Sequence, residues 1–365
     1  MGNNTLYIAA AGAGKTTFLV DRALRFASEK VLITTYTDEN TAVIKSEIRK
    51  RRGGIPNNIE VIPWFTFLLR YGVKPFLAST GFGDKDPQGV NLVNGRSAPY
   101  ARKTSPAYYF DNDEKVYNDK LAALALLENE RTNGLVIRRI SLVYDVILID
   151  EIQDVSGPDL DFIGCLLKSE CDVIMAGDQR QHTFSTNNAA RNSQFRSLGL
   201  GSYLESSGLV GLCKVDQETL NGSYRCSQPI LDFANTLYPD FPETVSLQRS
   251  SHQDGSHLGV YLIQRNAVME YSARWSPAPL RFDARSFVTD GISATNCGVS
   301  KGRTFDRVLF FPSGTILDWL KGKRDDLSGT TRAKLYVAVT RARFSVAIVV
   351  DQSFECHRSG VVSLP

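Results

Sequence analysis

A short segment near the start of the chain combines small residues with a lysine and two threonines. Ala9, Ala10 and Ala11 lead into Gly12-Ala13-Gly14, and Lys15-Thr16-Thr17 follow. Small residues before a lysine let successive backbone N–H groups point inward and form an anion nest at a helix N-terminus. A triphosphate fits such a nest, with Lys15 on the β- and γ-phosphates and the Thr16 hydroxyl on Mg²⁺. Residues 12–17 are therefore the predicted phosphate-binding set; the alternative is an ordinary glycine-rich turn.

A pair of acids follows a continuously apolar run further along the chain. Asp150 and Glu151 come directly after residues 146–149. A metal ion held by a triphosphate needs a carboxylate at the tip of a neighbouring strand, and Asp150 occupies that position. Glu151 is the natural base that orients or deprotonates an attacking water, because phosphoryl transfer depends mostly on placement and charge neutralisation. The alternative is a solvated strand end.

Two arginines in the second half of the chain are candidates for neutralising charge on a γ-phosphate. Arg225 ends the run Asn221-Gly222-Ser223-Tyr224-Arg225, and Arg341 lies within residues 336–343. Arginines with this role often come from a second domain, so that catalysis requires closure of the cleft between the domains. Taken alone, an arginine of this kind is more often a surface salt-bridge residue, and it is the order and company of the other motifs that favour the role at the phosphate.

The elements that must position these residues follow from the apolar runs. Residues 6–8, 31–35, 59–62, 145–149 and 171–176 are apolar without alternation and are separated by helix-like segments. Such strands indicate a parallel sheet covered on both faces. A second group of elements begins near Leu220, with strands predicted at 259–263, 285–289, 307–311 and 345–350. The predicted fold class is α/β, with two parallel-sheet lobes.

Length and composition set the domain boundaries. At 365 residues the chain exceeds one typical core. Residues 73–105 are rich in Gly, Pro, Asn and Asp, and a helical pattern follows at 117–130. We expect a first lobe from 1–72 and 141–215, an accessory insertion at 73–140, and a second lobe at 216–365.

Charge and cysteine content exclude several classes of protein. The net charge is only +3, from 42 basic and 39 acidic residues, so any nucleic-acid surface must be local. The six cysteines form no C-x-x-C pair, which argues against structural zinc and a disulfide framework. The N-terminus shows no signal-peptide pattern, and no apolar run is long enough to span a membrane. We expect a cytoplasmic protein without a membrane partner.

Taken in order, the motifs resemble those of the UvrD/Rep-type superfamily 1 (1A) DNA helicases. The matching segments are residues 9–16, Thr35-Tyr36-Thr37, 63–67, 150–154, 177–181, Tyr224-Arg225 with Ala234-Asn235, Ser300-Lys301-Gly302 and 339–343. The resemblance covers nearly the whole chain. It implies two RecA-like lobes with an ATP site in the cleft between them, and ATP and Mg²⁺ as cofactors.

The resemblance also implies roles for individual residues. The expected catalytic residues are Lys15, Glu151, Gln181, Arg225 and Arg341, with Gln181 sensing the γ-phosphate and Thr16 and Asp150 holding the metal. The expected contacts to single-stranded DNA are Tyr36, Thr37, Trp64, Phe65, Phe184 and Lys301. A single strand is gripped by stacking bases on aromatic faces and by contacts to phosphates. Each aromatic residue could equally belong to the core.

Departures from the family pattern bear on function. One is Thr186, which replaces the tryptophan that stacks a base in the family. Only residues 1–5 precede the first predicted strand in this sequence, so we expect no upstream glutamine of the kind that reads adenine in the family. Gly302-Arg303-Thr304 replaces the family's Gly-Leu-Glu. The segment between Asn235 and Ser300 is too short for the large subdomain of members that unwind duplexes.

The sequence therefore predicts a minimal ATP-dependent helicase or translocase on single-stranded DNA, with 3′ to 5′ movement implied by the resemblance. The alternative is a nucleic-acid-stimulated ATPase that gates a partner nuclease or effector without unwinding. RNA is an alternative strand.

Overall fold

The structure is a computed structural model that describes residues 3–93, 95–183, 191–248 and 257–364, apart from the side chains of 196–198. The chain divides into two compact units. The first comprises Met1–Ile8, Lys15–Gln179 and Phe184–Asp216, and the second comprises Ala9–Gly14, Arg180–Thr183 and Gln217–Pro365. The second unit thus includes two short segments from the N-terminal half of the chain, and both carry predicted site residues.

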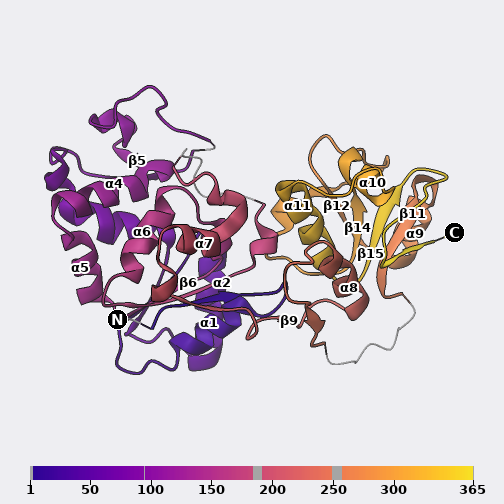
Figure 1. Ribbon diagram of the computed structural model, residues 1–365, viewed down its shortest axis with the longest axis horizontal. Helices are drawn as coiled ribbons and strands as arrows, with labels where there is room; N and C mark the ends of the chain where they lie inside the picture. Colours follow the sequence, from indigo (N-terminus) through magenta and orange to yellow (C-terminus); the bar gives the residue numbers. More distant parts are fainter. Residues whose placement is uncertain (1–2, 94, 184–190, 249–256, 365) are drawn as a thin grey trace. The chain divides into compact units, whose positions relative to one another are not determined.

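The first unit is built on a six-stranded sheet (Figure 1). Its strands, in sheet order, are β3 (Ile59–Pro63), β2 (Val31–Thr35), β6 (Val146–Ile149), β7 (Asp172–Gly177), β1 (Thr5–Ile8) and β8 (Lys214–Asp216). Every pair in it is parallel. The central strands β2 and β6 are buried at every residue, as expected for a parallel sheet covered on both faces.

Parallel strands bring residues far apart in sequence to one edge of the sheet. Ala9 follows β1, Tyr36 follows β2, Trp64 follows β3, Asp150 follows β6 and Asp178 follows β7. All five lie at carboxyl ends of strands, which is the edge where open α/β sheets bind ligands. This topology explains why the predicted site residues recur directly after apolar runs.

Helices α1 (Lys15–Ala23) and α2 (Asp38–Arg52) follow β1 and β2. Thr37 caps α2, since its side chain accepts a hydrogen bond from the Asn40 N–H at 3.1 Å. The helix ends at Gly53, whose φ of 73° is left-handed. Residues 49–52, at the end of this helix, are all basic and complement the negative end of the helix dipole. One of them, Arg51, forms an ion pair with Asp21 at 2.6 Å.

The accessory segment belongs to the first unit rather than forming a third. Its elements, with their neighbours, are α3 (Trp64–Phe67), η1 (Leu68–Val73), η2 (Lys74–Thr80), β4 (Gly89–Asn91), η3 (Pro106–Tyr108), β5 (Lys115–Tyr117), α4 (Asn118–Arg131) and α5 (Leu135–Val143). Helix α4 packs against η1, η2, α5 and α6 (Pro158–Leu167). The unit is completed by η4 (Ile152–Asp154), α7 (Phe195–Ser206) and η6 (Val210–Leu212).

The second unit has its own six-stranded sheet, again with all pairs parallel. Its strands, in sheet order, are β13 (Thr295–Asn296), β12 (Ala278–Arg281), β14 (Phe305–Phe311), β15 (Ala342–Val350), β11 (Gly259–Gln264) and β16 (Val361–Ser363). Its helices are α8 (Gln228–Thr236), α9 (Val268–Trp275), α10 (Gly314–Leu320) and α11 (Gly329–Thr340). Two short strands, β9 (Gly222–Ser223) and β10 (Val245–Ser246), pair separately.

Both faces of this second sheet are buried. Val308, Phe310 and Ile348 pack in one cluster with residues of α8, α10 and α11. Leu309 and Val349, one position along, pack in a second cluster with α9. Successive strand residues point to opposite faces, so the continuously apolar runs supply both clusters. The predicted α/β class with two parallel-sheet lobes is confirmed.

One predicted strand is wrong. Residues 285–289 form turn and irregular structure, and the strand lies earlier, at Ala278–Arg281. Pro279 lies within this strand, although proline donates no ladder hydrogen bond. The neighbouring strand β13 pairs only with Leu280 and Arg281, so β12 has no partner on that side at Pro279. The proline is tolerated for this reason.

Among the residues that the structure describes, no helix has the length and apolar character needed to cross a membrane.

Helix α4 carries a buried carboxylate without a counter-charge. Glu128 has no exposed surface, and neither carboxylate oxygen has a hydrogen-bond partner in the described part of the chain. Burial raises the pKa of Glu128 to about 9. The side chain is therefore neutral in the folded protein at pH 7 but charged in the unfolded chain, so folding takes up a proton there.

We predict that Glu128→Gln stabilises the protein above pH 5. The folded pKa lies above the unfolded one, so stability is greatest at low pH and falls as pH rises from about 4.5 towards 9. The gain at pH 7 should be on the order of 2 kcal/mol, and it should grow with pH. Urea unfolding at pH 5, 7 and 8.5 measures it, with Glu130→Gln on the exposed side of the same helix as control. A gain that does not change with pH would contradict the account.

Candidate functional site

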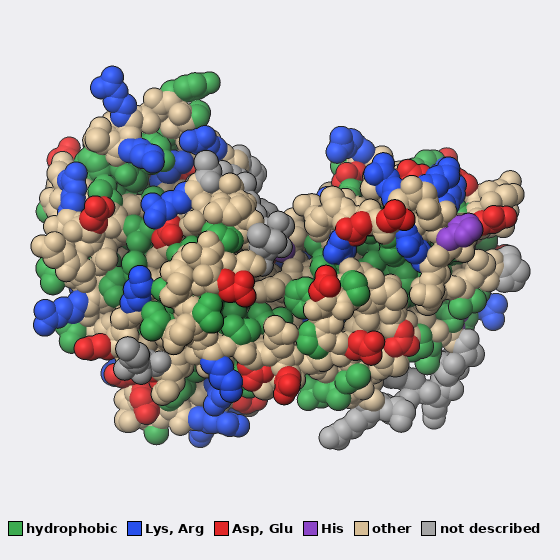
Figure 2. Space-filling model, in the orientation of Figure 1, with side chains coloured by type: hydrophobic (Ala, Val, Ile, Leu, Met, Phe, Trp, Pro, Cys, Tyr) green, Lys and Arg blue, Asp and Glu red, His purple; other side chains and the backbone are tan. Residues whose placement is uncertain are grey.

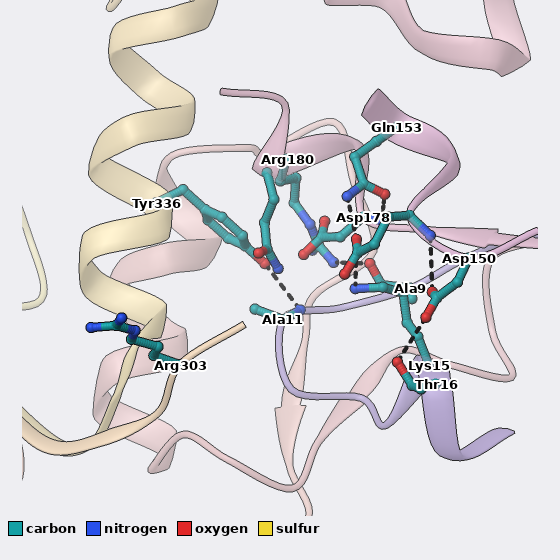
Figure 3. Close-up of polar contacts among 12 residues, drawn as sticks. Ala9, Ala11, Lys15, Thr16, Asp150, Gln153, Asp178, Arg180, Arg303 and Tyr336 are labelled. Atoms are coloured by element: carbon teal, nitrogen blue, oxygen red, sulfur yellow. Dashed lines mark hydrogen bonds and ion pairs between the residues drawn. The ribbon is translucent and has the colours of Figure 1, made fainter. Parts of the chain in front are cut away.

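The tip of β6 and the first turn of α1 meet through one hydrogen bond within the first unit. The Thr16 hydroxyl donates to Oδ2 of Asp150 at 2.8 Å, and Figure 3 shows the carboxylate pointing at this hydroxyl. Asp150 is 1% exposed. Burial, followed by the neighbouring Glu151 carboxylate, raises the pKa of Asp150 to about 6, against the opposing effects of Lys15 and Thr16. A buried carboxylate facing a hydroxyl is the hard-oxygen donor pair that Mg²⁺ prefers, so these two residues fit the ion.

Glu151 lies next to Asp150 in a conformation that few side chains adopt. Its φ of 55° is left-handed, which costs a non-glycine residue about 1–2 kcal/mol. Its Oε2 is 3.6 Å from the Lys15 ammonium and accepts a hydrogen bond from the Gln153 amide. With this backbone conformation, the Glu151 carboxylate lies next to Lys15, the lysine that is predicted to bind the phosphates.

Gln153 couples the tips of β6 and β7. Its amide nitrogen donates to Glu151. Its Oε1 accepts the Asp178 N–H at 3.0 Å (Figure 3). A Cβ at Gly177 would lie 2.5 Å from this oxygen, so a glycine is needed for Gln153 to reach the strand. Gln153 thereby holds the Glu151 carboxylate in place.

The phosphate loop, residues 9–16, runs across the division of the chain into units: residues 9–14 belong to the second. Gly12 and Gly14 have φ of 77° and 78°, the left-handed region that glycine enters without cost. Helix α1 begins at Lys15, and the N–H groups of its first turn have no intrahelical acceptor. The loop thus has the backbone features of an anion nest that leads into a helix N-terminus.

Several contacts within the second unit hold the first half of the loop. The Ala10 N–H donates to Leu220 O at 2.8 Å, and the Tyr224 N–H donates to Gly12 O at 3.0 Å. The Ala11 N–H points at the Tyr336 hydroxyl at 3.4 Å (Figure 3). The loop conformation therefore depends on residues about 200 to 300 positions away in sequence.

The two predicted arginines converge at the C-terminus of α11, within the second unit. Arg225 donates to Thr340 O at 3.2 Å, and Arg341 directly follows the helix. Cations are favoured at this end of a helix dipole. Arg225 also lies against the phosphate loop, since a Cβ at Gly12 would be 2.6 Å from its Cβ. Arg341 is buried, and its guanidinium donates to Oε1 of Gln181 at 2.8 Å.

Arg180, next to Gln181, is a further buried cation in this unit. It donates to Ala9 O and to the Thr244 hydroxyl, both at 3.1 Å, and its guanidinium lies 5.3 Å from the ring centroid of Tyr336. Arg180 therefore joins the start of the phosphate loop to α11. Figure 3 shows Arg180 and Tyr336 beside the residues of the loop in this unit.

Three of the four aromatic residues predicted to stack on DNA, Tyr36, Trp64 and Phe65, form one cluster in the first unit. The Tyr36 ring lies 5.9 Å from Trp64 and 6.2 Å from Phe65, measured between centroids. Trp64 is fully buried, and its indole donates to Asp159 at 2.8 Å. In this conformation Trp64 supports the cluster, whereas Tyr36 and Phe65 are partly exposed.

The remaining candidates for DNA contact lie in different surroundings. Thr37 is exposed and serves as the N-cap of α2. Lys301 lies just after the short helix η8 (Cys297–Ser300) and is partly exposed. Phe184 lies outside the described residues. Their contacts with nucleic acid stay a prediction.

Gln153, Arg180 and Tyr336 have no role predicted from the sequence. Gln153 and Arg180 lie inside the motif segments 150–154 and 177–181, so their place in those motifs was the only signal, and Tyr336 lies outside the last motif, 339–343. Their functions come from contacts to distant backbone groups, and no local pattern encodes those contacts.

Comparison with known proteins finds no matching family and no matching curated protein. Among solved structures, a PRRSV helicase is 16% identical over 95% of this chain and 52% of its own, with a TM-score of 0.44. Arterivirus nonstructural protein 10 (helicase) in complex with DNA is 14% identical over 96% of this chain and 61% of its own, with a TM-score of 0.47. A crystal structure of arterivirus nonstructural protein 10 (helicase) is 15% identical over 96% of this chain and 59% of its own, with a TM-score of 0.48. The chain spans between half and two thirds of these structures.

We predict that Gly12→Ala destabilises the protein more than Gly53→Ala. Both glycines have left-handed φ, but a Cβ at Gly53 meets nothing within 4 Å, whereas one at Gly12 would also meet Ser223 at 2.8 Å. Gly53→Ala should cost about 1 kcal/mol from backbone strain alone, and Gly12→Ala should cost more. Denaturant unfolding followed by tryptophan fluorescence compares the two variants. Equal losses would show that the loop does not pack against the Ser223 segment.

Proposed function

We propose that this chain is an ATP-hydrolysing motor of the UvrD/Rep type that moves along single-stranded DNA, 3′ to 5′ in direction. The observation that carries the proposal is the hydrogen bond between Thr16 and Asp150, beside the Lys15–Glu151 ion pair. A hydroxyl, a buried carboxylate, a lysine and a second carboxylate around a helix N-terminus are the parts that phosphoryl transfer to water requires.

Residues of the loop and of α1 bind the triphosphate in this proposal. The N–H groups of the first turn of α1 and the Lys15 ammonium face the negative phosphate oxygens. Mg²⁺, when bound, would neutralise phosphate charge, and Thr16 and Asp150 would hold it. The Lys15 ammonium lies 3.6 Å from Oε2 of Glu151, so the residue proposed for the phosphates and the residue proposed for the water are neighbours.

Glu151 acts on the attacking water. Its carboxylate orients the water and accepts a proton at Oε2 while the water oxygen bonds to the γ-phosphorus and the bond to the β,γ-bridging oxygen breaks. Gln153 fixes this carboxylate through its second hydrogen bond to the Asp178 N–H. Positioning of this kind supplies much of the rate enhancement in phosphoryl transfer.

Arg225, Arg341 and Gln181 respond to charge on the γ-phosphate. Arg225 lies against the loop at Gly12, and Arg341 is hydrogen-bonded to Gln181. A guanidinium placed near the leaving phosphoryl oxygens stabilises the developing charge. Because these residues belong to the same unit as residues 9–14, a change in the phosphates can reach the second sheet through α11.

A single strand of DNA is the proposed track. Tyr36 and Phe65 offer aromatic faces at the carboxyl edge of the first sheet, where bases can stack. Tyr36 directly follows β2, and the Asp150 N–H donates to Thr34 O in the same strand. If DNA binding shifts Tyr36, the shift would therefore reach Asp150 through the backbone hydrogen bond between Asp150 and Thr34.

We predict that Lys15→Ala and Glu151→Gln each reduce Mg-ATP turnover by at least about 10²-fold. Lys15→Ala should weaken nucleotide binding, whereas Glu151→Gln should bind ATP and fail to hydrolyse it, because the amide cannot accept the proton. Steady-state phosphate release and nucleotide titration measure the two effects. Lys168→Ala, an exposed lysine at the end of α6, is the matched control. Wild-type rates in either site variant would refute the assignment.

We predict that Arg341→Ala lowers turnover on the order of 10³-fold, with much less effect on ATP affinity. Arg343→Ala is the control, since Arg343 is half exposed and pairs with Asp306 at 3.1 Å. Arg341→Lys separates charge from folding: it should keep the fold and restore only part of the rate. A loss below tenfold in Arg341→Ala would reduce this residue to a structural arginine.

A second function is favoured by the segment between α8 and η8. The described residues there form only β10, β11, η7 (Arg265–Ala267), α9, β12 and β13, and they add no subdomain beyond the second sheet and its covering elements. The chain would then be a nucleic-acid-stimulated ATPase that gates a partner nuclease or effector. A strand-displacement assay on a tailed duplex separates the two: a helicase opens it unaided, and a gate leaves it closed. Matched DNA and RNA oligonucleotides in competition identify the strand.

A further inference from the structure

The first unit contains a cavity of about 610 Å³ that the proposed function does not use. Its walls come from the accessory segment, from α4, and from α6 at Pro158 and Cys165. Its lining includes no residue of the phosphate loop and none of the predicted site residues. The volume lies within the range of pockets that hold small organic ligands, and it far exceeds the size of a single phosphate ion.

The cavity is lined by more positive than negative charge. Its cations are Arg96, Lys103, Lys120, Arg131 and Arg191, and its acids are Asp119 and Glu130. Figure 2 shows Lys and Arg side chains gathered over this part of the first unit, at the upper left. The chain as a whole carries a net charge of only +3, so the cavity concentrates positive charge locally.

Part of this charge is neutralised inside the protein. Asp119 and Lys120 are both buried and form an ion pair at 2.6 Å, and Asp119 also accepts the Ser97 N–H at 3.1 Å. Arg191 is paired with Asp161. Three cations, Arg96, Lys103 and Arg131, and one acid, Glu130, then remain in the lining, so the remaining charge is positive.

Those three cations are exposed and available to a ligand. For Arg96 and Lys103, no carboxylate lies within ion-pair distance among the described residues, and Arg131 reaches only the carbonyl of Ser79, at 3.3 Å. Arginine and lysine side chains bind phosphate oxygens through charge-assisted hydrogen bonds. The rim of the cavity is therefore suited to an anionic phosphate group.

Aromatic side chains line the same cavity. Tyr108 and Tyr109 have ring centroids 4.9 Å apart, and Phe82 lies 5.7 Å from Tyr109. The Lys120 ammonium is 4.8 Å from the Tyr108 centroid, which fixes one side of that ring. Tyr108 is only partly buried, so the rest of its surface is open to a planar ligand. Nucleic-acid bases stack on such rings with little dependence on sequence.

We propose that this cavity is a second nucleotide site, which binds a nucleoside phosphate with its phosphate on Arg96, Lys103 and Arg131 and its base against Tyr108. The ligand is either a free nucleotide or the phosphorylated end of a nucleic-acid strand, because both present the same chemistry. The inference does not rest on the proposed function, since it uses no residue of the hydrolytic site.

Calorimetric titration of the full chain tests the proposal. All proteins carry Lys15→Ala, so that binding at the phosphate loop is weakened equally in every arm. The test variant adds Lys103→Ala and Arg131→Ala, and the control adds Arg102→Ala and Arg138→Ala. The control residues are exposed arginines: Arg102 is next to Lys103, Arg138 lies in the following helix α5, and neither lines the cavity. The ligands are AMP, adenosine, inorganic phosphate, and a short oligothymidylate with and without a 5′-phosphate.

AMP or the 5′-phosphorylated oligonucleotide should bind the control protein and lose at least tenfold in affinity in the test variant. Preference for AMP identifies a free nucleotide, and preference for the phosphorylated oligonucleotide identifies a strand end. Adenosine and inorganic phosphate should each bind more weakly than the preferred ligand. Equal affinity in the test and control proteins would overturn the proposal, as would binding of inorganic phosphate as tight as that of AMP.

Discussion

The hydrogen bond from the Thr16 hydroxyl to the Asp150 carboxylate is the contact on which the candidate site depends. It joins the first turn of α1 to the tip of β6, two elements that are more than 130 residues apart. Because β7 lies between β6 and β1 in the sheet, the contact spans a neighbouring strand at the carboxyl edge. With it in place, Lys15 and Glu151 come within ion-pair distance and the other strand tips can be organised around them.

The surroundings of this contact are arranged at an energetic cost. Asp150 is buried beside a second carboxylate, and Glu151 has a left-handed backbone that its residue type disfavours. Gln153 and Gly177 hold that arrangement by connecting two strand ends. Strain and close carboxylates of this kind are maintained where the surrounding structure over-determines them, and they cluster at functional sites.

Much of the fold could be predicted from the sequence, because short continuous apolar runs separated by helix-like segments are typical of buried strands in a parallel sheet. Residues 31–35 form β2 as predicted, and Asp150 and Glu151 follow β6. The strand near Pro279 could not be predicted, because its tolerance depends on how far β13 extends alongside it. The role of Trp64 was equally hidden: its neighbour Asp159 belongs to α6, about 95 residues away. Long-range pairing thus determined what local pattern could not.

The central claim is that the residues around Thr16 and Asp150 hydrolyse ATP in response to a single strand. Its most direct test is steady-state Mg-ATP hydrolysis by the purified chain, titrated with single-stranded DNA and compared with Glu151→Gln at each point. The account predicts a rate that rises with the strand and saturates, while the variant stays at background. A wild-type rate indistinguishable from that of the variant at every DNA concentration would contradict it.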